Sequence, residues 1–211
     1  MPYSIDLALA HLSEVDPVLG AIIELTPFDM QLRSGKPFDS LFRTILFQQL
    51  AGAAANAIQR RLLDLHEPHG QVPTPEQLLE TTDEEFRSVG VSRQKAAYMR
   101  DLAQKTLDGT LDFAHFPEMG DAEVIKRITA VHGLGEWSAH MYLMFHLGRP
   151  DVLPIGDLGV RNGMKLAYGL EKTPTPKEAT AIGAKWAPYR SVGSWYMWRA
   201  VIDRGATAPD I

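Results

Sequence analysis

Apolar and polar residues along this chain follow helical spacing almost throughout. Apolar residues recur three and four positions apart in most segments. The chain has no sustained two-residue alternation and no Asn-Gly turn between β-branched runs, which are the sequence signs of strands and hairpins. The pattern therefore predicts an all-α fold with short connections. The predicted helices span residues 37–66, 74–80, 82–89, 93–109, 122–131, 136–147, 157–170, 175–189 and 191–205.

Side chains at the helix boundaries refine these limits. The first helix is expected to begin at Asp39 or Ser40 and to bend near Gly52. Ser92 is expected to cap the N-terminus of the helix that follows it, and Asp121 that of the next one.

The composition is that of a globular protein. Of its 211 residues, 45% are hydrophobic and 22% are charged, which is enough to bury a core in one or two compact domains. Because there is no cysteine, disulfides, thiolate zinc sites and cysteine-ligated iron–sulfur clusters are excluded. No apolar run reaches the ~18 residues of a membrane span, and the first residues lack the basic region of a secretory signal. We therefore expect a cytoplasmic protein with no membrane association.

The charge is unevenly distributed. The net charge of −5 argues mildly against nucleic-acid binding, but residues 158–200 hold seven basic and two acidic side chains. An acidic protein with one basic face can still bind phosphates. Ordinary surface charge explains the same distribution equally well, so charge alone leaves both interpretations open.

The segment "ITAVHGLGEWSAHM" is typical of two helices joined by a Gly-Leu-Gly turn. Gly133 and Gly135 can both take positive φ and leave their N–H groups uncovered. The second helix begins directly after them, and amides that converge on a helix N-terminus form an anion site suited to a DNA phosphate. A helical corner that simply needed glycines is the alternative. Apolar Leu134 between the glycines and small Ser138 after them favour the anion site.

A single carboxylate, Asp157, stands between a Pro-Gly break and a helix that begins at Leu158. Its simplest interpretation is an N-cap of that helix. A cap position also fixes the carboxylate in place, and a fixed acid can stabilise positive charge that develops next to it. The two interpretations are compatible.

Other polar and aromatic residues have structural explanations of their own. Gln48 and Gln49 interrupt an apolar helical stretch before Leu50, and a helix end that faces solvent accounts for them. Aromatic residues near the C-terminus, including Tyr196 and Trp198, can belong to the core.

Five separated segments together resemble a known family. In chain order they are "ILFQQLAGAAA" (45–55), "VGVSRQKAAYMRDLA" (89–103), "VHGLGEWSA" (131–139), "LPIGDLGV" (153–160) and "WAPYRSVGSWYMW" (186–198). Each is a weak signal alone, but the five occur in the order of the family's own segments. Over residues 38–200 the chain resembles the helix-hairpin-helix DNA glycosylases, in particular the 3-methyladenine DNA glycosylase II group.

The resemblance implies two helical subdomains that flank an active-site cleft, without an N-terminal β domain. One subdomain would comprise residues 38–152 with the hairpin at 132–136. The other would pair residues 1–37 with 153–211, which carry Asp157 and the C-terminal aromatic residues.

The implied activity is that of a monofunctional glycosylase acting in base-excision repair. It would hydrolyse the N-glycosidic bond of alkylated purines of the 3-methyladenine and 7-methylguanine type and leave an abasic site. Such a base already carries positive charge and leaves without a second acid, so one aspartate suffices. Relatives that also cut the strand carry a lysine where this chain has Trp137. Glycosylases for etheno, oxidised or mismatched bases, and a non-enzymatic binder of DNA structure, are the alternatives.

The resemblance also implies individual roles. The implied residues are Asp157 for catalysis; Trp137, Trp198 and Tyr196 for the base pocket; Leu50 and Gln49 for the DNA wedge; Gly133, Leu134, Gly135 and Ser138 for a DNA phosphate; and the backbone carbonyls of Thr129, Val131 and Leu134 for a structural Na⁺ or K⁺. We expect no required cofactor. The expected partner is double-stranded DNA with damaged bases, bound by a cytoplasmic, nucleoid-associated monomer.

Overall fold

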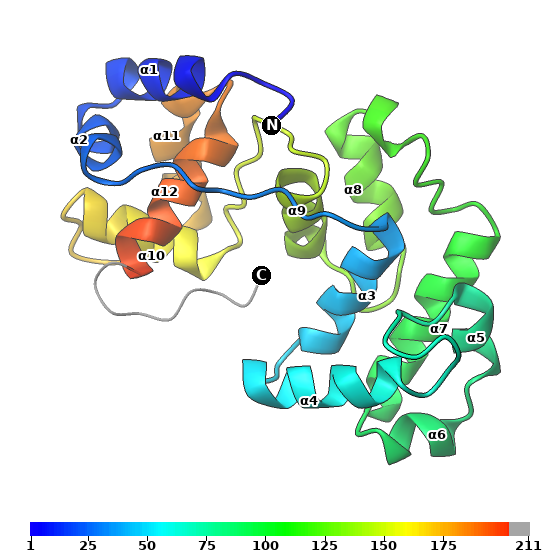
Figure 1. Cartoon of the computed structure of the whole chain (residues 1–211). Coiled ribbons are helices and arrows are strands. Elements are labelled where there is room, and N and C mark those ends of the chain that lie inside the picture. Colours follow the sequence, from blue (N-terminus) through cyan, green and yellow to red (C-terminus); the bar gives the residue numbers. More distant parts are fainter. Residues whose placement is uncertain (203–211) are drawn as a thin grey trace. The chain divides into compact units, whose positions relative to one another are not determined.

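The computed structural model describes residues 1–202, and every regular element within that range is a helix (Figure 1). The α-helices are α1 (Ile5–Val15), α2 (Pro17–Leu25), α3 (Pro37–Phe47), α4 (Gly52–Leu63), α5 (Pro75–Glu80), α6 (Asp83–Ser88), α7 (Arg93–Leu107), α8 (Asp121–Thr129), α9 (Glu136–Phe145), α10 (Leu158–Ala167), α11 (Pro176–Gly183) and α12 (Arg190–Ile202). Two short 3-10 helices are η1 (Phe116–Glu118) and η2 (Ala184–Trp186). The all-α prediction is confirmed. None of these helices is both long and apolar enough to cross a membrane.

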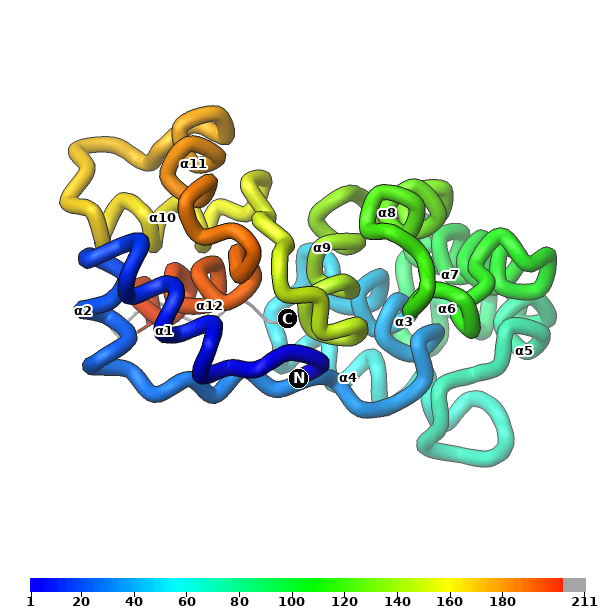
Figure 2. The backbone as a smooth tube through the Cα atoms, turned by 90° about the horizontal axis from the view of Figure 1, so that it is seen from above, coloured from blue at the N-terminus to red at the C-terminus, as the bar shows by residue number. Residues whose placement is uncertain are grey.

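The chain folds into two compact units. Among the described residues, 1–33 and 143–202 form the first unit, and 34–142 form the second. Figure 2 shows α10, α11 and α12 gathered with α1 and α2 in the first unit. The chain passes between the units at 33/34 and inside α9 at 142/143, whereas the sequence placed these crossings at 37/38 and 152/153. The expected second subdomain also included residues 203–211, which lie outside the described residues.

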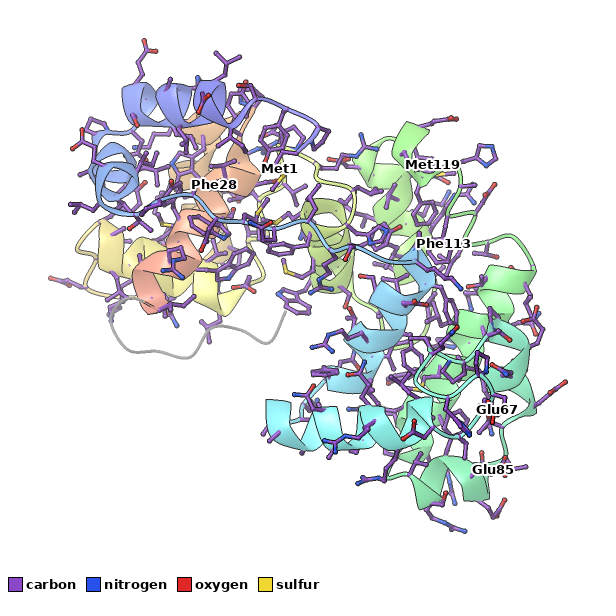
Figure 3. All side chains as sticks on the ribbon, viewed as in Figure 1. Met1, Phe28, Glu67, Glu85, Phe113 and Met119 are labelled. Atoms are coloured by element: carbon purple, nitrogen blue, oxygen red, sulfur yellow. The ribbon has the colours of Figure 1, made fainter. Side chains whose placement is uncertain are left out.

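In the first unit, helices from the beginning and from the end of the described residues pack together. Helix α10 lies along α12, and both α1 and α2 contact α12. Gly163 of α10 makes the close approach possible, since a Cβ at that position would lie 2.0 Å from the carbonyl oxygen of Met197 in α12. Phe28, marked in Figure 3, packs edge-on against Trp195 of α12 with ring centroids 4.8 Å apart. The result is a core shared by the N-terminal and C-terminal helices.

A buried carboxylate strengthens this connection. Asp16 is fully buried and caps the N-terminus of α2, where it accepts a hydrogen bond from the Leu19 N–H at 3.3 Å. It also accepts hydrogen bonds from Trp186 Nε1 at 2.8 Å and from the Tyr168 hydroxyl. Lys185 Nζ lies 3.1 Å from the same carboxylate. One acid thus joins the α1–α2 junction to the end of α10 and to η2.

Helix α7 is the centre of the second unit, where it contacts α3, α5 and α6. Its inner face includes Met99 and Leu102, both fully buried. An aromatic cluster fills another part of this core. Phe113, marked in Figure 3, lies 5.2 Å from Phe116, which in turn meets Tyr142 edge-on at 5.8 Å. Burial of these side chains supplies the main stabilisation of the unit.

The boundary signals in the sequence are largely confirmed. Thr74 with Gln77, and Thr82 with Glu85, form complete capping boxes at the starts of α5 and α6. Ser92 caps α7 as predicted. The short polar-capped helices were therefore predictable from local sequence alone.

Three local expectations were wrong. The helix expected over residues 37–66 is two helices, α3 and α4, separated by a turn in which Gln49 has a φ of 56°. A left-handed residue cannot continue an α-helix, so the chain breaks rather than bends there. Helix α3 begins at Pro37, before the expected start at Asp39 or Ser40, because proline is pre-organised for the first helical position. Asp121 is the first residue of α8 rather than its cap.

Candidate functional site

Asp157 occupies the predicted cap position at the start of α10. Its N–H donates to the Pro154 carbonyl at 2.9 Å, which closes the turn that precedes the helix. Its Oδ1 accepts the Val160 N–H at 2.8 Å and Trp198 Nε1 at 2.9 Å. The residue is 7% exposed. A carboxylate held in this way has a fixed orientation and little surrounding water, which suits an electrostatic role.

Trp198 lies on α12 and is buried beneath this carboxylate. It is 3% exposed, and its ring lies 5.8 Å from that of Phe145 at an interplanar angle of 31°. The sequence suggested a wall of the base pocket. The structure gives this indole a specific partner, Asp157, which is 41 residues away in the sequence.

Tyr196 is a core residue of the first unit in this structure. It is fully buried, its hydroxyl donates to the Thr26 carbonyl at 3.2 Å, and its ring meets Trp195 edge-on at 4.9 Å. Burial raises the pKa of Tyr196 to about 12, so the phenol remains a neutral donor at physiological pH. Its contacts are those of a packing residue.

Leu158 is an exposed apolar residue that the sequence analysis did not single out. It follows Asp157 directly and is 58% exposed. The available signal was an apolar residue directly beside a candidate catalytic acid.

The hairpin glycines differ from each other. Gly133 has a φ of 85°, and a Cβ at that position would lie 2.1 Å from the ring of Tyr98. Gly135 is not in the positive-φ region, contrary to expectation, because α9 starts directly after it. A Cβ at Gly135 would have no heavy atom within 4 Å beyond its immediate chain neighbours in the described part of the chain. The fold explains the need for Gly133, whereas the described residues give no packing reason for Gly135.

Two amides of the hairpin are used within the protein. The His132 N–H donates to Asp101 Oδ2 at 2.7 Å, and the Leu134 N–H donates to the Val131 carbonyl at 3.1 Å. Burial raises the pKa of Asp101, but hydrogen bonds from Lys105 and the His132 N–H outweigh it and hold the pKa below its ordinary value. Asp101 thus anchors the hairpin to α7.

Two of the residues expected to bind a phosphate, Leu134 and Ser138, have buried side chains. Each residue is 4% exposed, so its side chain packs inward. The N-terminus of α9 follows Gly135, and the partial positive charge of a helix N-terminus attracts anions. The backbone amides from Gly135 onward are therefore the remaining candidates for the phosphate site.

The turn between α3 and α4 carries the expected wedge residues. Gln49 is exposed at the tip, in a left-handed conformation that disfavours residues other than glycine by about 1 kcal/mol. Leu50 is half-exposed, and its N–H donates to the Phe47 carbonyl at 3.3 Å. A strained, exposed turn with an apolar residue is an observation that favours a contact role.

Gln48 joins this turn to the hairpin, and Lys95 of α7 binds the end of α3 that precedes it. Gln48 Nε2 donates to the Gly133 carbonyl at 2.7 Å, so the wedge turn and the hairpin are adjacent within the second unit. Lys95 Nζ donates to the Leu46 carbonyl near the end of α3, and burial lowers the pKa of this lysine. Neither contact was predictable from the sequence, because each joins residues at least 49 positions apart.

Trp137 lies in the first turn of α9 and is 36% exposed. Among the three expected pocket residues it is therefore the one with substantial accessible ring surface. Stacking on a flipped base requires such a surface.

Of the three carbonyls expected to hold a cation, that of Thr129 belongs to the last residue of α8, and those of Val131 and Leu134 follow in the hairpin. The Val131 carbonyl accepts one hydrogen bond, from the Leu134 N–H at 3.1 Å. A carbonyl oxygen has two lone pairs, so this bond is compatible with cation ligation. Residues 1–202 contain no cluster of three or more histidine or acidic side chains arranged to hold a metal ion.

Comparison with known proteins identifies the class to which this fold and these sites belong. The family described as the HhH-GPD superfamily base excision DNA repair protein matches residues 42–189. This chain belongs to that family.

Individual relatives match nearly the whole chain. DNA-3-methyladenine glycosylase 1 of Schizosaccharomyces pombe is 32% identical, covering 93% of this chain and 87% of the relative. A solved DNA-3-methyladenine glycosidase from Bacillus halodurans has a TM-score of 0.83 and 36% identity, covering 92% of this chain and 88% of its own. An S. pombe 3-methyladenine DNA glycosylase solved in complex with abasic DNA has a TM-score of 0.78 and 32% identity, with 91% and 95% coverage.

Proposed function

We propose that this protein is a DNA glycosylase that hydrolyses the N-glycosidic bond of alkylated purines, of the 3-methyladenine and 7-methylguanine type, in base-excision repair. The observation that carries the proposal is the carboxylate of Asp157, buried and fixed by two donors at a helix N-terminus, in a member of a base-excision repair family. The names of the relatives support the alkylated-purine substrate.

DNA binding is assigned to the second unit. Backbone amides from Gly135 into the first turn of α9 would hold a phosphate, because they combine open space with the positive end of a helix. Leu50, with Gln49, would enter the space left by the flipped nucleotide, as an apolar wedge between base steps. The exposed ring of Trp137 would stack on a base.

The chemistry is assigned to Asp157. As the glycosidic bond breaks, positive charge develops on the sugar, and a fixed negative carboxylate stabilises it without reorganising. The same oxygen atoms can orient the attacking water at C1′. A purine alkylated on its ring is cationic before the reaction, so it departs without a proton from a second acid. One carboxylate is then sufficient for the reaction.

We further propose that the enzyme has no lyase activity. A lyase needs an amine that forms a Schiff base with the sugar, and Trp137 stands at the position of the relatives' lysine. Borohydride should therefore trap no covalent adduct between this protein and damaged DNA. A trapped adduct would overturn the assignment of a single hydrolytic step.

We also propose that the hairpin holds a structural monovalent cation. The carbonyls of Thr129, Val131 and Leu134 would hold Na⁺ or K⁺, and the ion would rigidify the turn that presents the phosphate site. The cation would have a structural role only, because the cleavage of the glycosidic bond is assigned to Asp157.

The test is a base-release assay on duplex DNA that carries methylated purines, run beside substrates with etheno, deaminated and oxidised bases. Release of 3-methyladenine or 7-methylguanine, faster than release of the other lesions, is the expected result. Faster release of an oxidised or mismatched base would correct the substrate class. Binding of all these duplexes without any release would show a binder of DNA structure instead.

A further inference from the structure

We propose that Trp198 is a positioning residue for Asp157, and that Gly159 is the residue that allows it to be one. This inference rests on the proposed function of Asp157. It assigns to Trp198 a role different from stacking on the damaged base, and it assigns to Gly159 the role of leaving room for the indole.

The first observation is the hydrogen bond itself. Trp198 Nε1 and the Val160 N–H donate to the same oxygen of Asp157, Oδ1, at 2.9 and 2.8 Å. One donor comes from α12 and the other from α10 itself. Two donors from different directions on one oxygen fix the plane of the carboxylate, which a single helix-cap bond would leave free to rotate.

The second observation is the space left for the indole. A Cβ at Gly159 would lie 2.9 Å from Cδ1 of Trp198 and 3.0 Å from Asp157 Oδ1. Both separations are shorter than ordinary van der Waals contacts, so a side chain there would push the indole and the carboxylate apart. One turn further along α10, Gly163 allows the backbone of α12 to approach. Glycines four residues apart on one helix face therefore set the distance between α10 and α12.

The third observation is the burial of the indole. Trp198 is 3% exposed and its ring lies against that of Phe145. A ring so enclosed has too little accessible face for a base to stack on. Its N–H, by contrast, is aimed at an acid that has lost most of its water, where a hydrogen bond has most effect.

An indole is suited to this position because it is a neutral donor. It compensates the buried carboxylate for lost hydration without supplying a countercharge of its own. The negative charge that would stabilise the developing sugar cation is therefore held in place without being neutralised by this contact.

The experiment compares Trp198→Phe with Trp195→Phe. Both substitutions remove an indole N–H and similar volume from buried sites on α12, but only Trp198 contacts Asp157. Single-turnover release of 7-methylguanine, affinity for abasic-site DNA and the thermal midpoint are measured for each. We expect Trp198→Phe to slow release by about 10–100-fold, as for loss of one hydrogen bond to a charged group, while affinity stays within about threefold. Trp195→Phe should stay within about threefold in both.

A second variant keeps the inference testable if Trp198→Phe folds poorly. Gly159→Ala retains the indole but should also slow release by about tenfold or more, and adding Trp198→Phe to it should have little further effect. Additive effects would contradict the proposal, as would normal release by Trp198→Phe or equal losses of rate and affinity. If the unaltered protein releases no base from any substrate, the proposed function has failed, not this inference alone.

Discussion

Asp16 and Asp157 are built from the same parts and lie in the same unit, yet their surroundings differ. Each is a buried acid that caps a helix, α2 and α10 respectively, and each accepts a hydrogen bond from a tryptophan indole. Asp16 is fully buried and pairs with Lys185 at 3.1 Å. Asp157 is 7% exposed and is followed by the exposed Leu158.

The same arrangement, a buried aspartate that caps a helix and accepts from an indole, is therefore suited to two different roles. Around Asp16, a lysine and a tyrosine hydroxyl add to the cap and indole donors, and the cluster joins segments 152 and 170 residues apart. Such a cross-link stabilises a fold. Around Asp157, cap and indole hold the carboxylate at a turn beside exposed apolar surface. That position favours presentation of charge to a ligand.

The largest effect on stability is expected from Asp16→Asn. The amide cannot accept from all the donors that now surround the carboxylate, and Lys185 loses its partner. We expect a loss of about 3 kcal/mol in the free energy of unfolding of the first unit. Asp157→Asn should cost about 1 kcal/mol or less, because asparagine caps helices as well as aspartate. Chemical denaturation followed by tryptophan fluorescence measures both. Equal losses of unfolding free energy in the two variants would contradict the different roles of Asp16 and Asp157.

The hairpin offers a second pair of like residues with unlike roles. Gly133→Ala places a methyl against the ring of Tyr98 at a positive φ, so it should destabilise the second unit by about 2 kcal/mol. Gly135→Ala meets open space and should leave the thermal midpoint nearly unchanged. Its methyl group would occupy the open space through which a phosphate approaches the backbone, so DNA binding should weaken by about tenfold. The factor should be similar for duplexes of every sequence, because phosphate contacts carry no sequence information.

Melting curves and binding isotherms on several unrelated duplexes distinguish the two glycines. Unchanged DNA affinity in Gly135→Ala would remove the phosphate site from this position. An affinity loss confined to some sequences would argue for contacts with bases rather than with phosphates.

The smallest effect concerns pH. Burial raises the pKa of Asp16, but hydrogen bonds from Tyr168, Trp186 and Lys185 outweigh it and leave the pKa below its ordinary value. A lowered folded-state pKa means that the stabilisation is present above the unfolded-state pKa of about 3.9 and is lost as pH falls through the folded value. Stability should therefore decline below about pH 4, and this decline should be shallower in Asp16→Asn. Identical acid limbs in the two proteins would contradict a charged Asp16.

Local sequence predicted much of the fold but little of the contrast between Asp16 and Asp157. The capping boxes at Thr74 and Thr82, the Ser92 cap and the Asp157 cap depend on residues three apart, so a single sequence reveals them. The break at Gln49 depends on one left-handed residue with no glycine to mark it. Helices α1 and α2 were not predicted, although Ser4 and Asp16 cap them.

The tertiary contacts could not be predicted for a physical reason. The role of a buried acid depends on the hydrogen-bond donors around it. Such an acid can join distant segments, as Asp16 does, or hold its charge toward a ligand, as proposed for Asp157. The donors that decide between these roles are distant in sequence. The indole of Trp198 comes from 41 residues away, and that of Trp186 comes to Asp16 from 170 residues away. Gly133 and Gly135 likewise stand in the same motif, and the positive φ of Gly133 and the position of Tyr98 separate their roles.

The most direct test is base release by Asp157→Asn and Asp16→Asn, measured under single-turnover conditions at a temperature where both are folded. Asp157→Asn should slow release of alkylated purines by about 10²–10³-fold or more while binding to abasic-site DNA stays largely intact. Asp16→Asn should release base at nearly the unaltered rate per folded molecule. Substantial release by Asp157→Asn, or its loss in folded Asp16→Asn, would contradict the assignment of the chemistry to Asp157.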